Sequence, residues 1–423
     1  MTAVASVLLL SLPLARALAL PRPPTPAATS IPAAKPLVVC TSAGSLEGLG
    51  FCRAAVSSGE YRVRALTRSL TSARTRQLEA IGAEVVVADN HDPSALEAAF
   101  AGAAAVYGIT TWSGSTFAAD GSVRRPADVT SESLLASEVA QGLNIVAAAE
   151  KAGVGHFVLQ SMHRGGLRDG ELSADGHLVD ASVPAPLHHR AKWRQEEALR
   201  ASSLRCWSIL RQPTYLENFG NDALAAKGTR LRLLHPGVVS GLLAPETELT
   251  VIAVDDLGQI ALAIMKEGDA YHGRTLAAGA ERISGRALAA AAGRVNPRVR
   301  FAYRPVPWAV LRFAIPVAYP RQLRRWLARG GNDEGAAADA DAAVFAESRR
   351  LHPGTLTSVE AWLEARGVGA FEPPPAQRLA AALSRWTTWR LEAPAADIRA
   401  PKGAASPDAP AAAGRVEGSR QVA

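Results

Sequence analysis

The stretch Pro36-Leu-Val-Val-Cys-Thr-Ser-Ala-Gly-Ser-Leu-Glu-Gly-Leu-Gly-Phe51 decides the fold class of this chain. Its apolar residues 37–40 predict a buried strand, the small residues after them predict a tight turn, and an apolar helix begins before Phe51. In such a unit the helix N-terminus presents backbone N–H groups to a pyrophosphate. The stretch therefore predicts the first strand-turn-helix unit of a dinucleotide-binding fold.

The turn departs from the usual glycine pattern. Laid over G-x-x-G-x-x-G without gaps, the glycine positions fall on Ser42, Ser45 and Gly48, with Gly44 between them. A serine in the left-handed conformation costs roughly 1–2 kcal/mol, although its hydroxyl could donate to a phosphate oxygen. Two alternatives stay open: a turn that holds the pyrophosphate, and a turn of the same shape that binds nothing. In the first, the residues expected at the pyrophosphate are Ser42, Gly44, Ser45, Leu46, Glu47 and Gly48.

The second predicted strand, residues 61–66, ends at Thr67 and Arg68. This fold places the group that reads the adenosine ribose at that point. An acidic residue would accept hydrogen bonds from a 2′-hydroxyl, whereas an arginine suits a 2′-phosphate. Arg68 therefore predicts NADP(H), with NAD(H) as the less favoured ligand.

Strands and helices then alternate along the chain. Helices are expected at 72–81, after the Asp92-Pro93 pair and at 133–151, and strands at 84–88, 105–109 and 156–160. This alternation predicts a Rossmann-type α/β fold with a doubly wound parallel sheet. Ligands of such sheets lie beyond the carboxyl ends of the strands. The polar residues expected there are Ser42, Arg68, Asp89, Thr110 and Ser161.

Composition narrows the class of protein. The chain has 423 residues, a formal net charge of +7 and a pI near 9.6. Its arginines are scattered and form no basic block interleaved with aromatic residues, so we expect no specific nucleic-acid partner. Cys40, Cys52 and Cys206 match no metal-binding spacing and are expected to be buried apolar residues, and no metal site is expected.

Both ends of the chain are predicted to lie outside the folded domain. Residues 4–14 form a short apolar run, and residues 21–35 contain no acidic residue, so residues 1–34 are expected to be a cleavable targeting segment. An organelle, such as a plastid reached by a signal and transit sequence, fits better than secretion. Residues 369–423 are expected to be a mostly disordered tail. Within it, 379–391 predicts a basic amphipathic helix with Trp386 and Trp389, which could contact a membrane, a protein partner or nothing.

Several segments together resemble the NmrA-like family, an atypical branch of the short-chain dehydrogenase/reductase superfamily. In chain order they are Val63-Arg-Ala-Leu-Thr-Arg68, Gly82-Ala-Glu-Val-Val-Val-Ala-Asp89, Gln141-Gly-Leu-Asn144, Ala152-Gly-Val-Gly-His-Phe157, Leu210-Arg-Gln-Pro-Thr-Tyr-Leu-Glu-Asn-Phe219, Val254-Asp-Asp-Leu-Gly258 and His352-Pro-Gly-Thr-Leu-Thr-Ser-Val-Glu-Ala-Trp-Leu363. The resemblance implies an NAD(P)-binding domain over 35–368. Its smaller α+β lobe would be formed mainly by about 212–250 and 265–368.

The resemblance also assigns roles to single residues. It places Arg68 at the 2′-phosphate of NADP(H), Asp89 and Asn90 near the adenine, and Thr110 along the cofactor. The two lost glycines depart from the family pattern, and so does Gln212, which stands where the family usually has proline. Glu217 and Trp112 would either contact a substrate or hold the two lobes together.

Catalysis by the superfamily uses Tyr-x-x-x-Lys on a helix, which places both side chains on one face. In the helix expected at 187–199, Lys192 occupies the lysine position and His188 stands where the tyrosine would be. A histidine can donate a proton near neutrality. NmrA-like proteins commonly carry histidine there and are often cofactor sensors without turnover. Two functions therefore remain: an NADP(H) sensor that contacts a protein partner, and an NADPH-dependent reductase. The alternatives in which these residues have no function are a solvated helix charge at Lys192 and a polar helix start at His188.

Overall fold

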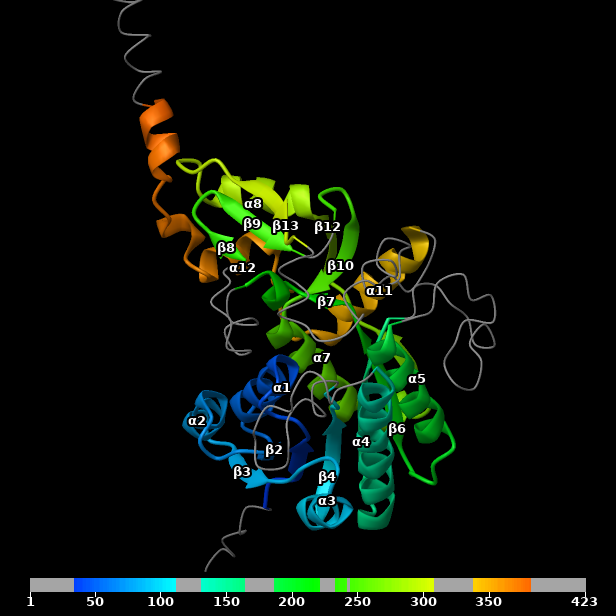
Figure 1. Ribbon diagram of the computed structural model, residues 1–423. Coiled ribbons are helices and arrows are strands. Elements are labelled where there is room, and N and C mark those ends of the chain that lie inside the picture. The colour runs from blue at the N-terminus through cyan, green and yellow to red at the C-terminus, as the bar shows by residue number, and fades with distance from the viewer. Residues whose placement is uncertain are drawn as a thin grey trace, which may run out of the picture.

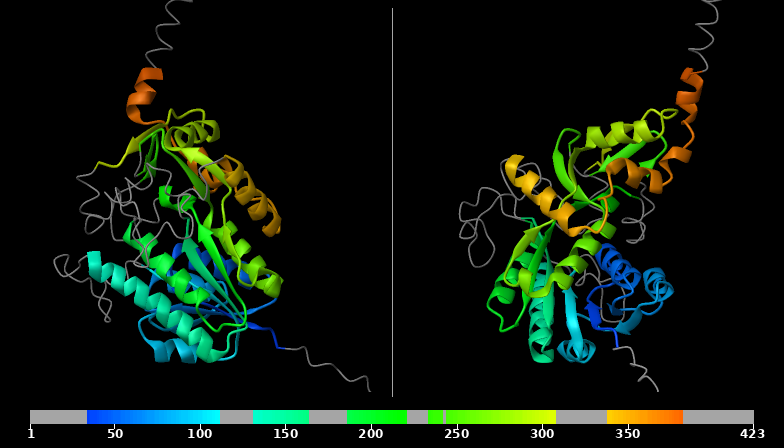
Figure 2. Two further views of the ribbon diagram at one scale, coloured as in Figure 1. Left: turned by 90° about the vertical axis from the view of Figure 1, so that its right-hand side faces the viewer. Right: turned by 180° about the vertical axis from the view of Figure 1, so that it is seen from behind.

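The computed structural model describes residues 34–111, 131–163, 186–220, 233–241, 244–307 and 338–381. They form a large lobe around one sheet and a smaller lobe above it (Figure 1). Figure 2 shows the same two lobes, stacked end to end, from two further sides. The expected targeting segment, Trp112, Trp386 and Trp389 lie outside the described residues, and the predictions about them stay predictions.

The large lobe is built on a sheet of seven strands in the order β11-β6-β5-β4-β1-β2-β3, and every neighbouring pair is parallel. The strands are β1 (Leu37–Cys40), β2 (Arg62–Thr67), β3 (Glu84–Val87), β4 (Ala103–Gly108), β5 (His156–Met162), β6 (Trp207–Gln212) and β11 (Thr275–Ala277). The chain winds outward from β1 in both directions. The predicted doubly wound parallel sheet is confirmed.

Helices cover both faces of this sheet. On one face, α1 (Leu46–Ser57), α2 (Ala73–Ala80) and α7 (Val254–Glu267) share one apolar core with the strands. On the other, α3 (Pro93–Phe100), α4 (Ser131–Ala152) and α5 (Leu187–Arg200) pack on a second core. The expected caps form, because Ser72 accepts from the Thr75 amide and Asp92 from the Ala95 amide.

Helix α1 is held unusually close to α7. A Cβ atom on Gly50 would lie 2.4 Å from the carbonyl oxygen of Val254, and one on Gly258 would lie 2.5 Å from that of Gly50. Only glycine allows the two backbones to approach this closely. The contact fixes the direction of α1, and with it the position of the turn at its N-terminus.

The smaller lobe contains two three-stranded sheets, β12-β10-β7 and β13-β9-β8. Its elements are β7 (Thr214–Tyr215), η3 (Leu216–Phe219), β8 (Leu234–His235), β9 (Val238–Gly241), β10 (Glu248–Ile252), β12 (Glu281–Ser284), α8 (Gly285–Val295), β13 (Ala302–Pro305), α12 (Val359–Ala365) and η5 (Val368–Ala370). Their apolar side chains form a third core, on which Phe301 and Tyr303 pack. Two more elements, η4 (Gly268–Tyr271) and α11 (Ala338–Leu351), flank β11 and α7. Among the described residues, no helix is long and apolar enough to cross a membrane.

Candidate cofactor site

The two serines of the turn adopt different conformations. Ser42 has φ +47°, which is left-handed, and it is the one residue other than glycine with positive φ in the part of the chain that the structure describes. Ser45 has φ −73° and is the N-cap of α1, where its hydroxyl accepts a hydrogen bond from the Gly48 amide at 3.1 Å. Only Ser42 therefore carries the backbone cost of replacing a glycine. At the second position serine is favourable, because it caps the helix.

The turn offers backbone amides to a ligand. Within it, the amides of Thr41 and Ala43 donate to strand carbonyls, and that of Ser45 donates to the Ser42 carbonyl. Four other amides have no acceptor among the described residues: those of Ser42, Gly44, Leu46 and Glu47. Gly48 allows the tight turn, because a Cβ there would lie 2.7 Å from the Ala43 Cα. Unbonded amides at a helix N-terminus suit a pyrophosphate, so the residues fit a dinucleotide.

Asn90 lies beneath the turn. It is 6% exposed, and its Nδ2 donates to Ser42 Oγ at 3.0 Å and to the Ile109 carbonyl at 3.1 Å. The resemblance expected Asn90 near the adenine. That position stays a prediction, and the structure shows that the Asn90 amide donates to the left-handed residue of the turn.

The ends of β2 and β3 bring charged groups together beside the turn. Arg68 is exposed after β2, and Asp89 follows β3. A hydrogen bond from His91 lowers the pKa of Asp89, and the charge of Arg68 adds to this effect. Arg74, on the first turn of α2, donates to the Gly44 carbonyl at 3.1 Å. In the sequence, Arg74 is one of the scattered basic residues. Its position two residues after the Ser72 cap could have placed it beside the turn.

Lys192 is completely buried. Its Nζ donates to the Gln160 side chain, to the Gln160 carbonyl at 3.2 Å and to the Thr110 carbonyl at 3.4 Å. A lysine ammonium has three donors, so all three are used within the protein. Burial lowers the pKa of Lys192, and the nearby Glu138 opposes that shift. The solvated-charge alternative for Lys192 is wrong.

Glu138 of α4 links the two candidate catalytic residues. Its carboxylate is 1% exposed and lies 2.7 Å from His188 Nδ1 and 3.9 Å from Lys192 Nζ. It also accepts from the Thr110 hydroxyl at 3.0 Å, so this hydroxyl faces the α4–α5 side. His188 is therefore not a simple polar helix start. Glu138 is not among the residues predicted from the sequence. Its place on the helix face of Leu134, Gln141 and Ile145, which are all buried, was the available signal.

Ser161, at the end of β5, belongs to a separate ionic cluster. Its hydroxyl donates to Glu196 at 2.6 Å, and the same carboxylate accepts two bonds from Arg211, at 2.9 and 2.8 Å. Glu196 is fully buried. This arrangement ties α5 to β5 and β6, and it points the Ser161 hydroxyl at α5.

The profile of the NmrA-like family matches residues 34–363 of this chain. The chain belongs to the NmrA-like family. An NmrA-like family domain-containing oxidoreductase of Aspergillus hancockii is 34% identical over 131 residues, and one of Aspergillus campestris is 37% identical over 75 residues. The matches cover 31% and 18% of this chain, but only 35% and 22% of those relatives.

Solved structures share the fold of this NmrA-like protein. NmrA, a negative transcriptional regulator solved in complex with NAD, is 20% identical with a TM-score of 0.54, over 79% of this chain and 96% of NmrA. The Citrobacter sp. triphenylmethane reductase complexed with NADP(H) is 18% identical with a TM-score of 0.52, over 78% of this chain and 99% of the reductase. At these identities the likeness concerns the fold.

Glu217 joins the two lobes of this NmrA-like protein. Its carboxylate accepts from the Val254 amide at the start of α7 and from Trp362 Nε1 of α12, both at 3.1 Å, and Arg366 lies 3.6 Å away. Burial raises the pKa of Glu217. Two roles were expected for Glu217, contact with a substrate or holding the lobes together. These contacts support the second role.

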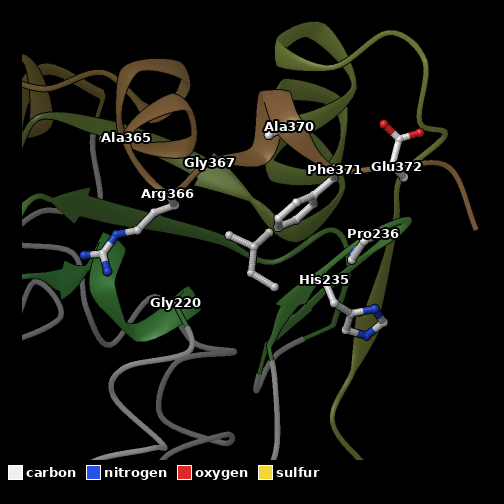
Figure 3. A pocket seen from close by; sticks show the side chains of 10 residues that line it. Gly220, His235, Pro236, Ala365, Arg366, Gly367, Ala370, Phe371 and Glu372 are labelled. Carbon is white, nitrogen blue, oxygen red and sulfur yellow. The ribbon is translucent and has the colours of Figure 1, made fainter.

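A cavity of about 710 Å³ lies in the smaller lobe. Figure 3 shows the Phe371 ring facing into it, with Arg366 on one side and His235 on the other. None of the predicted cofactor-binding residues lines it. Arg366, which pairs with Glu217, connects this cavity to the junction between the lobes.

Proposed function

We propose that this NmrA-like protein binds NADP(H) at the N-terminus of α1 and acts as a redox sensor or a regulatory or assembly factor without turnover. The turn supplies the amides for the pyrophosphate, and the crevice beyond the strand ends receives the rest of the dinucleotide. Solved relatives of the same fold, which were crystallised with NAD or NADP, support this choice of ligand.

The burial and the hydrogen bonds of Lys192 are the observation that favours a sensor. In the usual Tyr-x-x-x-Lys arrangement the lysine bonds the ribose and lowers the pKa of the tyrosine. Here its three donors already bond Gln160 and Thr110, and the side chain is fully buried. Bonding a ribose would require the ammonium to give up one of these acceptors, and a buried unsatisfied acceptor costs about 1–3 kcal/mol. No phenol stands at position 188.

Two arginines support NADP(H) over NAD(H). Arg68 follows β2, where the ribose is read, and Arg74 approaches the same turn from α2. Guanidinium groups bind phosphate well, so a 2′-phosphate would gain charge-assisted hydrogen bonds there. In this proposal Arg68→Ala weakens NADP⁺ binding and leaves NAD⁺ binding nearly unchanged.

A sensor also requires a partner that responds to the cofactor. The nicotinamide ring is positively charged when oxidised and neutral when reduced, so the two forms can favour different arrangements of the site. Glu217 connects the start of α7 to Trp362 in the smaller lobe. We propose that the smaller lobe or the tail presents the state of the cofactor to a protein partner.

The alternative is a reductase that moves hydride from NADPH to a small carbonyl or unsaturated compound. The His188–Glu138 pair favours it. A carboxylate 2.7 Å from Nδ1 fixes the orientation of the imidazole. When bound, NADPH would supply the hydride, and His188 or a water would supply the proton.

Binding and turnover separate these functions. The full chain would be titrated with NADP⁺, NADPH and NAD⁺ by calorimetry, and NADPH oxidation would be followed against a panel of aldehydes, ketones and quinones. The sensor predicts binding without NADPH consumption. Consumption that disappears in His188→Asn, with NADPH binding retained, would establish the reductase instead. A chain that binds no dinucleotide would contradict both.

A further inference from the structure

The cavity of the smaller lobe has charged groups at its ends and apolar groups between them. Figure 3 shows Arg366 at one end, His235 and Glu372 at the other, and the Phe371 ring between them. Pro236 adds a second apolar surface to the lining. The volume of about 710 Å³ lies within the roughly 300–1,000 Å³ typical of pockets that hold small organic ligands. The cavity is therefore large enough for a molecule with one aromatic ring and a short side chain.

Hydrogen bonds fix the wall that carries Phe371. Helix α12 is followed by Gly367, whose φ of +75° turns the chain into η5. Asn296 is 2% exposed, and its Nδ2 donates to the Val368 carbonyl at 2.9 Å and to the Phe371 carbonyl at 2.8 Å. This side of the cavity is therefore formed without a ligand.

The Arg366 guanidinium is held at the edge of the cavity. Its central carbon lies 5.2 Å from the centre of the Trp362 ring, and its Nη2 lies 3.6 Å from Glu217 Oε1, while 29% of the side chain stays exposed. Gly220 also lines the cavity, and a Cβ atom there would lie 3.9 Å from Arg366 Nη1. Because Gly220 has no side chain, a ligand can approach this edge of the guanidinium. A guanidinium has five N–H donors in a planar fork, so it can pair with Glu217 and bind a second carboxylate.

Two carboxylates of the protein limit the charge that a ligand can carry. Glu217 shares the Arg366 guanidinium, and Glu372 at the opposite end would repel a second anionic group. A phosphate or a dicarboxylate therefore fits less well than a single carboxylate on an apolar body. The imidazole of His235 can donate or accept a hydrogen bond at the far end.

We propose that this cavity is a binding site for a small aromatic carboxylate. The carboxylate of the ligand pairs with Arg366, and its ring packs on Phe371 and Pro236. Because Arg366 also pairs with Glu217, the ligand and Glu217 compete for one guanidinium. The ligand thereby acts on the residue that joins the two lobes. The site does not depend on dinucleotide binding at α1.

The cavity also has a purely structural explanation, as a gap between packed elements that is filled with water. Such a gap would not distinguish a carboxylate from a neutral molecule of the same shape. Arg294 provides a matched control for Arg366, because it lies in the same lobe, pairs with Glu360 of α12 and does not line the cavity.

The test is titration of the full chain with 3-phenylpropionate and with the neutral 3-phenylpropanamide, followed by calorimetry and ligand-observed NMR. At about pH 8 the ligand carboxylate is ionised. We expect 3-phenylpropionate to bind saturably and about tenfold or more tightly than the amide, since a charge-assisted bond is lost in the amide. Arg366→Gln should remove this preference, and Arg294→Gln should leave it unchanged.

Glu217→Gln gives a readout that a structural role alone would not produce. With the competing carboxylate removed, the affinity for 3-phenylpropionate should rise severalfold, although the variant is expected to be less stable. Circular dichroism would establish that each variant is folded. If Arg366→Gln does not fold, the comparison of acid and amide together with Glu217→Gln still decides the question.

Equal affinity of the wild-type protein for the acid and the amide, or no saturable binding of either, would overturn the inference. A preference for the acid that persists in folded Arg366→Gln would place the carboxylate elsewhere and would also overturn it. An affinity that is unchanged or lower in folded Glu217→Gln would contradict the competition for Arg366. None of these results bears on dinucleotide binding, which the titration with NADP⁺ tests separately.

Discussion

Asn90 and Ser42 are joined by a hydrogen bond of 3.0 Å from the side-chain amide of one to the hydroxyl of the other. The bond connects the residue that follows β3 to the left-handed residue of the turn, 48 positions earlier in the chain. A glycine at position 42 would have no side chain to anchor. The serine costs backbone energy but gains this contact, which fixes the conformation of the turn.

Asn90→Ala should lower the free energy of unfolding by about 1–3 kcal/mol, because the Ser42 hydroxyl and the Ile109 carbonyl lose a buried donor. The loss should be smaller when Ser42→Gly is already present, since glycine adopts positive φ without strain and has no hydroxyl. Urea unfolding of the four proteins of this double-mutant cycle measures the coupling. Strictly additive effects would show that the bond does not support the turn.

Gly48→Ala and Gly44→Ala form a matched pair within the turn. A Cβ at position 48 would collide with backbone atoms of Ala43 at 2.7 Å, whereas the nearest atom at position 44 is the Thr67 hydroxyl at 4.0 Å. We expect Gly48→Ala to destabilise the protein by roughly 2 kcal/mol or more, since backbone atoms must move. Gly44→Ala should change stability by less than about 1 kcal/mol. Equal thermal midpoints for the two variants would contradict the observed turn.

His156 should make stability depend on pH. It is 5% exposed on β5, with Nε2 2.9 Å from the Ser208 hydroxyl, and burial lowers its pKa from 6.5 to about 4. Between these values the unfolded chain binds a proton that the folded chain does not. Stability is therefore lost as pH falls from 6.5 toward 4, by up to about 3 kcal/mol. His156→Asn should remove this slope in urea unfolding at several pH values, and identical slopes would refute the assignment.

Glu217→Gln should weaken the junction between the lobes. The Val254 amide and Trp362 Nε1 both require an acceptor, and a glutamine amide has only one oxygen. We expect a loss of about 1–3 kcal/mol in the free energy of unfolding. Glu360→Gln, which removes a partly exposed carboxylate paired with Arg294, should cost less than about 1 kcal/mol. A smaller effect at Glu217 than at Glu360 would rule out the junction role.

The sequence predicted the elements of the large lobe because their signals are local. Caps at Ser72 and Asp92, and the small residues of the turn, require only a few neighbouring residues. Strand β4 begins at Ala103 rather than 105, since alanines give a weak strand signal, and register with β1 sets its start.

The environment of the candidate site was harder to predict. Lys192 is buried because Gln160 and Thr110 supply acceptors, and these lie 32 and 82 residues away in the sequence. Glu138 likewise becomes a buried partner of His188 only when α4 and α5 pack side by side, 50 residues apart in the chain. Such pairings depend on tertiary packing, so residue type and spacing could identify Lys192 and His188 but not their partners.

Amide hydrogen exchange of the full chain, with and without NADP⁺, tests the central claim most directly. We expect NADP⁺ to slow exchange at the turn amides that have no acceptor among the described residues, those of Ser42, Gly44, Leu46 and Glu47. Unchanged exchange across residues 41–48 at saturating NADP⁺, or protection confined to the residues around Arg366 and Phe371, would contradict it.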